Sequence, residues 1–328
     1  MDVTEEDLAL IHALQIAPRI SWIDAAEILE THPTTLANRW ERLRRSGLAW
    51  VTANEIGTTM DSALSFLDVE CTLAERGSVI DALCGMTEVV SVVESARNRD
   101  LMLIVQTRTL ADLGRSVVPR LTAIPGVTRY QASMCTRLHT EGHSWRLNVL
   151  NKKQQALLEA VVPQKSERRA VLTDADRRIL RCLTRDGRAT AAEIAREIGV
   201  HPTTVSRRLN RILASNLLSF RCEMAQQYSA YPVSCQWFAN VPPGQHEAAA
   251  EALKGFHNLR LCTSTTGTSN FTFVMWLKSV EDVMSVELAV TERIPAIHFV
   301  ESTVALNYPK RVGWMLDTDG RATGRVVV

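Results

Sequence analysis

The chain has 328 residues, of which 46% are hydrophobic and 22% are charged, and its formal net charge at pH 7 is +1. The length predicts two or more folded domains, and the near-neutral total confines any basic surface to a local cluster of residues. The acidic start of the chain and the lack of an apolar run of about 20 residues argue against a signal peptide and a membrane-spanning helix.

The chemistry-bearing residues follow no pattern typical of an enzyme or a metal protein. The seven cysteines are odd in number and form no C-x-x-C pair, which argues against a zinc ribbon and a secreted disulfide framework. Walker, G-x-S-x-G and H-E-x-x-H motifs are absent from the sequence. We interpret the cysteines as buried thiols in a reducing compartment, with a redox-sensing thiol as the alternative. We expect neither catalysis nor a bound metal or cofactor.

Residues 1–52 are predicted to fold into a first helix-turn-helix domain. Its third helix follows the tetrapeptide HPTT and a tight turn. The apolar residues of this helix are spaced four and three apart, which is typical of one buried stripe. The stripe consists of Leu36, Trp40 and Leu43. The opposite face carries donors suited to phosphates and base edges, namely Thr34, Thr35, Asn38, Arg39 and Arg42.

Residues 60–145 are predicted to form a domain with the order β-α-β-β-α-β. Strands are expected at 62–71, 88–95, 101–108 and 126–138, and helices at 76–86 and 110–124. This order is the ferredoxin-like split βαβ unit. Both helices lie on one face of its sheet, so the other face needs a cover such as a second sheet. In the connecting segment 146–170 we expect a helix at 152–162 and then a solvated linker, QKSERR.

Residues 171–222 repeat the helix-turn-helix pattern. Thr173 is predicted to cap the first helix, Gly199 to end the second and Pro202 to begin the third. Twelve Lys and Arg against six Asp and Glu between residues 165 and 211 give this region a local charge of +6. The buried stripe of the third helix is Val205, Leu209 and Ile212. Its exposed donors are Thr203, Thr204, Arg207, Arg208 and Arg211.

Residues 228–316 repeat the β-α-β-β-α-β order. Strands are expected at 233–241, 259–267, 271–279 and 296–306, and helices at 246–256 and 280–294. The segment YPKRVGWMLDTDGR is predicted to form a terminal strand and the start of a tail, which occupies residues 317–328, with Lys310 and Arg311 solvated.

A shift of 169 residues overlays the two helix-turn-helix segments without a gap. HPTT recurs at His32 and His201, and Arg19 meets Arg188. Downstream, IPGV in the first half faces IPAI in the second at a shift of 170. A period of this length indicates duplication of a whole two-domain module. The two histidines have no Cys or His partners at ligand spacing, so we interpret them as structural or phosphate-contacting residues rather than metal ligands.

The two helix-turn-helix domains, winged or plain, and the two ferredoxin-like domains together predict an α+β fold. This arrangement resembles the Lrp/AsnC, or feast/famine, family of transcriptional regulators. The resemblance rests on TDADRRILRCLTRDGRATAAEIAREIGVHPTTVSRRLNRILASNLL and on the IPGV and IPAI segments. It implies a sequence-specific, cytoplasmic and nucleoid-associated regulator that forms homo-oligomers. It also implies that the two ferredoxin-like domains pack sheet to sheet, as in the family's dimer.

The partner that this resemblance implies is double-stranded DNA. Asn38 suits adenine and Arg207 suits guanine, and the two occupy the same helix position. We therefore expect an imperfect palindrome with unlike half-sites, spaced by about one helical turn or a multiple of it. Arg42 and Arg211 suit phosphates equally well. The alternative for both heads is a helix-turn-helix that contacts only protein.

The resemblance also implies a small-molecule effector such as an amino acid, bound at one turn in each ferredoxin-like domain. Family members usually place a Gly in this turn and an Asp three or four residues later, and neither half keeps both. The candidate residues are Ala96, Arg97 and Asp100 in the first half and Gly267, Thr268 and Asn270 in the second. A plain hairpin turn is the alternative interpretation of each.

A second resemblance is to sirohaem decarboxylases, which have the same two-module build and bind a tetrapyrrole between the ferredoxin-like modules. Their recognition helices have no reason to keep exposed arginines. The arginines of this chain therefore favour the regulator, with the decarboxylase as the alternative.

Overall fold

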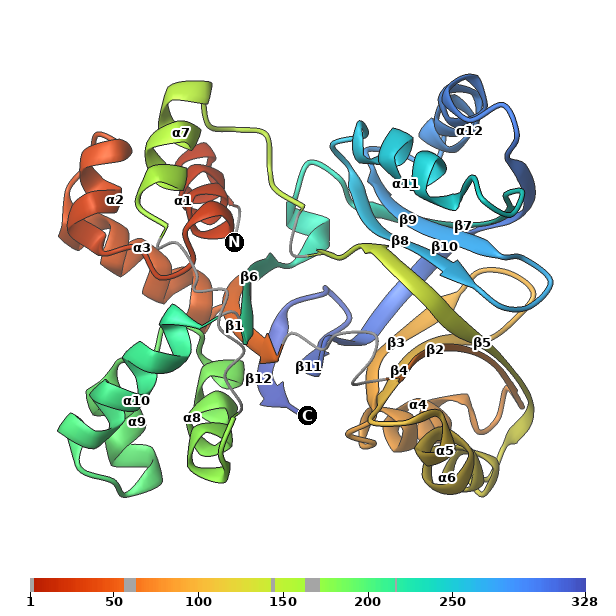
Figure 1. Ribbon diagram of the computed structural model, residues 1–328, viewed down its shortest axis with the longest axis horizontal. Coiled ribbons are helices and arrows are strands. Elements are labelled where there is room, and N and C mark those ends of the chain that lie inside the picture. The colour runs from red at the N-terminus through yellow and green to blue at the C-terminus, as the bar shows by residue number, and fades with distance from the viewer. Residues whose placement is uncertain (1–2, 56–62, 143–144, 163–171, 216) are drawn as a thin grey trace. The chain divides into compact units, whose positions relative to one another are not determined.

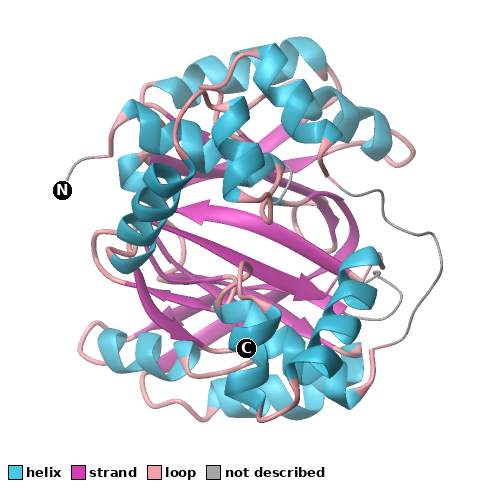
Figure 2. Cartoon of the chain, turned by 90° about the vertical axis from the view of Figure 1, so that its left-hand side faces the viewer, coloured by secondary structure: helices cyan, strands magenta, loops and turns pink. Residues whose placement is uncertain are grey.

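The computed structural model describes residues 3–55, 63–142, 145–162, 172–215 and 217–328. The chain divides into two compact units (Figure 1). The head unit comprises Met1–Ile56 and Arg146–Ala225, and the sheet unit comprises Gly57–Trp145 and Gln226–Val328. Helices and strands are both abundant (Figure 2), which confirms the predicted mixed α and β content. In the described residues no helix is long and apolar enough to cross a membrane.

The head unit contains two similar groups of three helices and a strand. The first group is α1 (Glu5–Ile16), α2 (Trp22–Ile28), α3 (Pro33–Arg45) and β1 (Ala49–Glu55). The second group is α8 (Asp174–Arg185), α9 (Ala191–Ile198), α10 (Pro202–Ala214) and β6 (Leu218–Met224). Both predicted apolar stripes of the third helices are buried. Gly199 ends α9 with a φ of 65°, a left-handed conformation that costs a residue without a side chain little.

A two-stranded sheet joins the two heads. Strand β1 pairs antiparallel with β6 along its whole length, from Ala49 opposite Met224 to Glu55 opposite Leu218. Each strand satisfies the backbone groups that the other would leave open to water. The two heads therefore share one hydrogen-bonded element within the head unit.

Two arginines at repeated positions lock the heads together. Arg19 and Arg188 each reach across and donate from two guanidinium nitrogens to backbone carbonyls in the loop between the first two helices of the opposite head. The acceptors are Gly187 and Ala189 for Arg19 and Pro18 and Ile20 for Arg188. The Arg188 guanidinium also lies 4.0 Å from the ring centroid of Trp22, a favourable cation–π distance. The exchange is reciprocal, as expected for two equivalent modules around a local two-fold axis.

The connecting segment packs on the first head. Helix α7 (Lys152–Ala160) occupies most of the helix predicted at 152–162, whereas the QKSERR linker lies outside the described residues. Just before α7, the Nδ1 atom of buried His12 accepts backbone N–H groups from Leu150 at 3.1 Å and Val149 at 3.4 Å. A histidine of α1 thus fixes the approach to α7.

The sheet unit contains two runs of strands and helices in the same order. The first run is β2 (Ala63–Cys71), α4 (Arg76–Cys84), β3 (Val89–Ser95), β4 (Leu101–Thr107), the consecutive α5 (Leu110–Asp112), η1 (Leu113–Val117) and α6 (Val118–Thr122), and β5 (Val127–Thr140). The second run, after the 3-10 turn η3 (Gln226–Tyr228), is β7 (Val233–Asn240), α11 (His246–Lys254), β8 (Leu259–Thr265), β9 (Phe271–Leu277), α12 (Asp282–Arg293) and β10 (His298–Arg311).

Within each run the strands lie in the order fourth, first, third, second, which is the order of the split βαβ unit. The edges of the two runs then pair with each other. Strand β5 pairs with β8, and β10 pairs with β3, so that the eight strands close into a ring. The halves thus share edges in one hydrogen-bonded ring, where the sequence predicted only sheets packed face to face. Each half keeps its own core between helices and strands.

In the C-terminal segment the predicted terminal strand is present, but the predicted solvation of Lys310 and Arg311 and the predicted tail were wrong. Lys310 and Arg311 end β10 and are buried rather than solvated. The ammonium of Lys310 donates to the carbonyl of Met86 at 2.9 Å, and burial lowers the pKa of Lys310 to about 8. Residues predicted as a tail form β12 (Ala322–Val326), which pairs with β11 (Trp314–Leu316). The edge of β11, which exists only in the tertiary structure, gives this segment a strand to pair with.

The buried histidine of α1 predicts a pH dependence of stability. Burial, and then the charge of Arg146, lowers the pKa of His12 from 6.5 to about 4. The folded state therefore favours the neutral ring, so its contribution is complete above pH 6.5 and is lost as the pH falls towards 4. The loss approaches about 3 kcal/mol in the free energy of unfolding.

Urea unfolding of the native protein and of His12→Gln between pH 7 and pH 4 measures this contribution. Glutamine keeps an acceptor but does not titrate in this range, so the native protein should lose more stability over the window than the variant. Parallel curves for the two proteins would remove His12 as the cause.

Candidate nucleic-acid interface

The tetrapeptide HPTT begins α3 and α10 in the same way. The Nδ1 atom of His32 accepts the backbone N–H of Thr34 at 3.4 Å and lies 2.8 Å from its hydroxyl oxygen. His201 makes the same contacts with Thr203, at 3.4 and 2.9 Å. The histidines therefore cap the helices in place of the more common Ser or Asp, and the first threonine hydroxyl of each copy is already engaged.

In the first head, a buried carboxylate joins the start of α1 to the middle of α3. Asp7 is fully buried and completes a capping box with Thr4. The same carboxylate receives Arg42 at 2.5 Å and Arg39 at 3.5 Å. Arg39 also contacts Glu6 at 3.4 Å. Both arginines predicted to contact DNA thus also hold α3 against α1.

The second head repeats this arrangement at a shift of 169. Asp176 is fully buried, completes a capping box with Thr173, and receives Arg211 and, at 3.3 Å, Arg208. Burial alone raises the pKa of the Asp176 carboxyl, but hydrogen bonds from Thr173 and Arg211 outweigh it and lower the pKa overall. The ionised carboxylate is therefore the form that the fold uses.

The other residues predicted to contact DNA differ in exposure and in whether their side chains already have partners. Thr35, Asn38 and Arg207 are exposed, and Thr204 is half-buried. Within the described part of the chain, Arg207 has neither a hydrogen bond nor an ion pair, and so its guanidinium is the most available on α10. Asn38 occupies the matching position on α3. These two side chains present different chemistry at one equivalent place.

The two heads also differ in charge. Residues 3–55 contain eight Asp and Glu against five Arg, a net charge of −3. Residues 172–224, with the same elements, contain six Asp and Glu against ten Arg, a net charge of +4. On α3, Glu41 pairs with Arg44 at 3.1 Å and with Arg45 at 2.6 Å. The basic charge is therefore concentrated on the second head.

The predicted effector turns are held by their own acidic or amide residues. In the first half, the Asp100 carboxylate accepts the backbone N–H of Cys71 at 2.8 Å and lies 3.7 Å from Arg76. In the second half, Asn270 accepts from the N–H of Val241 and donates to its carbonyl, both at 2.9 Å. These side chains tie each turn to the end of the first strand of its half.

The other four candidate residues of these turns lie at the surface, where Ala96, Arg97, Gly267 and Thr268 are exposed. Gly267 has a φ of +117°, and a Cβ there would lie 2.9 Å from the Ser133 hydroxyl of β5. The positive φ favours glycine at this position, whereas the Ser133 hydroxyl could rotate away from a Cβ. Effector binding at the turns stays a prediction.

Comparison with known proteins identifies the second head. An AsnC-type helix-turn-helix domain matches residues 172–212, which confirms the helix-turn-helix predicted there. An uncharacterised HTH-type transcriptional regulator of Pyrococcus horikoshii is 26% identical over 137 residues, which are 42% of this chain and 85% of that protein. A similar regulator of Pyrococcus furiosus is 25% identical over 141 residues, 43% of this chain and 95% of that protein.

A solved structure resembles the fold of nearly the whole chain. The siroheme decarboxylase NirDL, in complex with an iron-uroporphyrin III analogue, superposes with a TM-score of 0.60. The match covers 94% of this chain and 93% of that one at 13% sequence identity. At this identity the comparison establishes a shared architecture and nothing about the reaction.

Sequence reasoning found the arginines but missed their acceptors. Asp7 and Asp176 occur at equivalent positions in the two halves, which was the available signal. A carboxylate in a first helical turn is usually assigned to capping alone, and only the packing of the third helix shows its second role.

Because Asp176 pairs with Arg208 and Arg211 but not with Arg207, the arginines of α10 should contribute unequally to the stability of the fold. Arg211→Ala removes one charged partner of the buried Asp176 and should lower the free energy of unfolding by about 1–3 kcal/mol. Arg207→Ala removes an exposed side chain and should change it by no more than about 0.5 kcal/mol.

Urea unfolding of the two variants beside the native protein provides the measurement, and each variant serves as the control for the other. Equal stability of Arg211→Ala and the native protein would show that the ion pair contributes nothing to the fold.

Proposed function

We propose that this protein is a sequence-specific DNA-binding transcriptional regulator. The observation that carries the proposal is α10, which presents the available Arg207 from a head of net charge +4 that matches an AsnC-type helix-turn-helix domain. Helix-turn-helix proteins insert the N-terminal part of this helix into the major groove. Basic side chains there supply attraction to phosphates and direct contacts to bases.

The two heads read unlike half-sites. Asn38 and Arg207 occupy equivalent positions, and an amide suits adenine whereas a guanidinium suits guanine. The β1–β6 pairing and the exchange of Arg19 and Arg188 hold the two recognition helices within one unit. This combination favours an imperfect palindrome, one half of which is bound mainly through the basic second head.

The chain arose by duplication of one two-domain module and works as an internal dimer. Two sets of contacts that repeat between the halves support this part of the proposal. The contacts of Asp7 and Asp176 repeat at a shift of 169, and the strand pairings Thr140–Cys262 and Lys310–Val92 repeat at a shift of 170. Such units assemble further into homo-oligomers in the cytoplasm, as the family resemblance implies.

A small metabolite such as an amino acid modulates the DNA binding. In the two turns, Asp100 and Asn270 already accept backbone hydrogen bonds. The exposed Arg97 and Thr268 are the residues that contact the metabolite. A thermal-shift screen of amino acids addresses this part directly, because a ligand that binds only the folded state raises apparent stability.

A tetrapyrrole protein is the second candidate, favoured by the likeness of the whole fold to siroheme decarboxylase NirDL. Titration of the purified protein with sirohaem, followed by absorbance, separates the two. A saturable spectral change at equimolar ligand, together with the absence of DNA binding, would replace the regulator with this candidate.

Selection from random double-stranded DNA should enrich a site with unlike halves, centred about one helical turn apart or a multiple of it. The half bound by α10 should contain a guanine that depends on Arg207, and the other half an adenine that depends on Asn38. Failure to enrich any sequence above background would refute the regulator.

Arg207→Ala and Asn38→Ala form a matched pair for binding assays on the selected site. Arg207→Ala should weaken binding by about 1–3 kcal/mol and relax the preference for guanine in the half-site bound by α10, because a direct base contact is lost. Asn38→Ala should relax base preference in the other half-site while leaving the salt slope unchanged. Unchanged affinity and unchanged base preference for Arg207→Ala would show that Arg207 does not contact a base.

A further inference from the structure

Helix α7 covers one side of α1 in the first head (Figure 1). Leu158 of α7 is fully buried, and the backbone just before α7 donates to His12 of α1. This side of α1 also includes Ala9 and Ile16, since residues three or four positions apart lie on one helix face. Helix α1 contains no lysine or arginine. The first head thus completes this side with a helix of the same chain.

The same side of the second head is basic and exposed. At a shift of 169 its residues are Arg178, Arg181 and Arg185, which we call the basic ridge. Arg178 donates to the carbonyl of Ile198 at 2.6 Å, and Arg185 pairs with Glu197 at 2.5 Å, so the end of α9 holds both in place. Arg181 lies between them along α8, and within the described residues its guanidinium has neither a hydrogen bond nor an ion pair.

The basic ridge faces away from the recognition helix. Asp176 marks the side of α8 that faces α10, because its carboxylate receives Arg208 and Arg211. The three arginines of the ridge follow Asp176 by two, five and nine positions, which places them roughly 140–200° around the helix axis from it. A DNA duplex bound at α10 therefore does not face the ridge.

The arginines of the ridge repel one another. Arg181 stands three positions after Arg178 and four before Arg185, the spacings at which side chains of a helix are neighbours and like charges destabilise it. A surface with clustered carboxylates relieves this repulsion and gains charge-assisted hydrogen bonds. The ridge is therefore suited to an acidic protein surface.

The first head carries such a surface on α2. Its acidic face, as we call it, consists of Asp24, Glu27 and Glu30, which are all exposed, and α2 contains no basic residue. In the part of the chain that the structure describes, the carboxylates of Glu27 and Glu30 have no hydrogen bond or ion pair. Ile23 lies beside them and is 71% exposed. The second head has Arg196 at the position of Glu27, so the sign of the charge is reversed between the heads.

The basic ridge and the acidic face complement each other in charge, and both belong to the head unit of every chain. Both are exposed in that unit, so neither covers the other within one chain. Ile23 adds an apolar surface, against which the methylene stems of arginines pack well. The surface that suits the ridge is therefore the first head of another copy.

We propose that the basic ridge of one copy binds the acidic face of a second copy, with Arg181 opposite Glu27. Two different surfaces meet in this contact, so the association continues from copy to copy in a ring or a row. The contact uses neither recognition helix. It is therefore independent of DNA binding and goes beyond the proposed function.

Sedimentation velocity of the full-length protein measures the association. The average mass should be higher at about 50 mM salt than at about 500 mM, because salt screens attraction between exposed charges. A mass that is the same at both salt concentrations, or that rises with salt, overturns the proposal.

Charge reversal on each side of the contact locates it. Arg181→Glu and Glu27→Lys should each weaken the association at low salt at least tenfold, because like charges then face each other. An equimolar mixture of the two variants should associate again, since every α2 then finds an α8 of opposite charge. Both side chains are exposed, so both variants should fold. Native association in either variant alone, or no association in the mixture, overturns the proposal.

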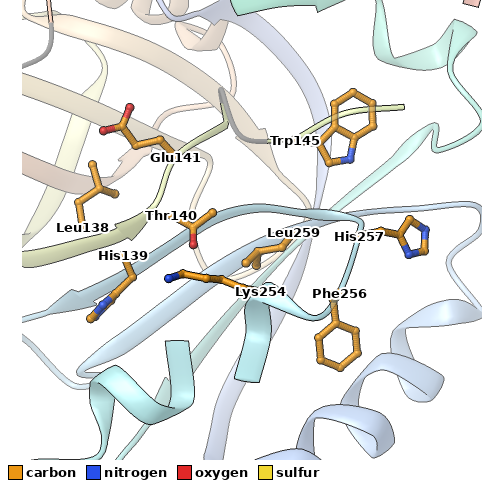
Figure 3. A pocket seen from close by; sticks show the side chains of 9 residues that line it. All are labelled: Leu138, His139, Thr140, Glu141, Trp145, Lys254, Phe256, His257 and Leu259. Atoms are coloured by element: carbon orange, nitrogen blue, oxygen red, sulfur yellow. The ribbon is translucent and has the colours of Figure 1, made fainter. Parts of the chain in front are cut away.

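Two control variants make the same change of charge elsewhere. Arg207→Glu lies in the second head, and Lys254→Glu lies in the sheet unit, beside the cavity shown in Figure 3. Both should associate as the native protein does. A loss in either control as large as that in Arg181→Glu would show that net charge, and not the ridge, drives association, and would overturn the proposal.

DNA binding by the same variants separates this contact from the proposed function. Weaker DNA binding by Arg181→Glu with unchanged self-association would assign the ridge to phosphates and overturn the proposal. Salt-dependent self-association with no DNA binding in any of the proteins would remove the proposed function and leave the contact between copies in place.

Discussion

The architecture depends on strand edges that one module cannot satisfy alone. Strand β1 needs β6, β5 needs β8, and β10 needs β3, and in each pair the partner belongs to the other half of the chain. An unpaired edge presents a row of open N–H and C=O groups, which is a liability in water. Pairing the halves removes these edges, and within the head unit the reciprocal arginines add further hydrogen bonds between the two heads. The need for a partner strand therefore accounts for the pairing of the two halves in both the head unit and the sheet unit.

Joining the two halves in one chain allows equivalent positions to differ. In a dimer of identical chains every substitution occurs twice, whereas here one copy changes alone. Arg99 illustrates this freedom: it bridges Asp68 at 3.1 Å and Glu301 at 2.8 Å. At the positions 170 residues away the sequence has Ser269, Phe238 and Gln131, which cannot form that bridge. The opposite net charges of the two heads are a further difference between the halves.

Arginines in the heads perform two physical tasks that sequence alone does not separate. Those facing Asp7 or Asp176 neutralise a buried carboxylate and fix the third helix, and the geometry of that helix is what any contact with DNA requires. Arg207 has no such partner in the described chain and is free to meet a ligand. The division explains why a basic face on a recognition helix overstates the number of side chains available for DNA.

The sequence by itself determined the elements and their order. The apolar spacing of Val205, Leu209 and Ile212 fixed the buried face of α10, and Gly199 fixed the end of α9, because helical periodicity and capping involve residues at most a few positions apart. The internal repeat likewise predicted two halves of equal build. Only the tertiary structure decided which strands share edges, that Lys310 is buried against Met86, and that Asp7 and Asp176 engage the arginines. These contacts join residues more than 30 positions apart, where local patterns carry no information about distance or direction.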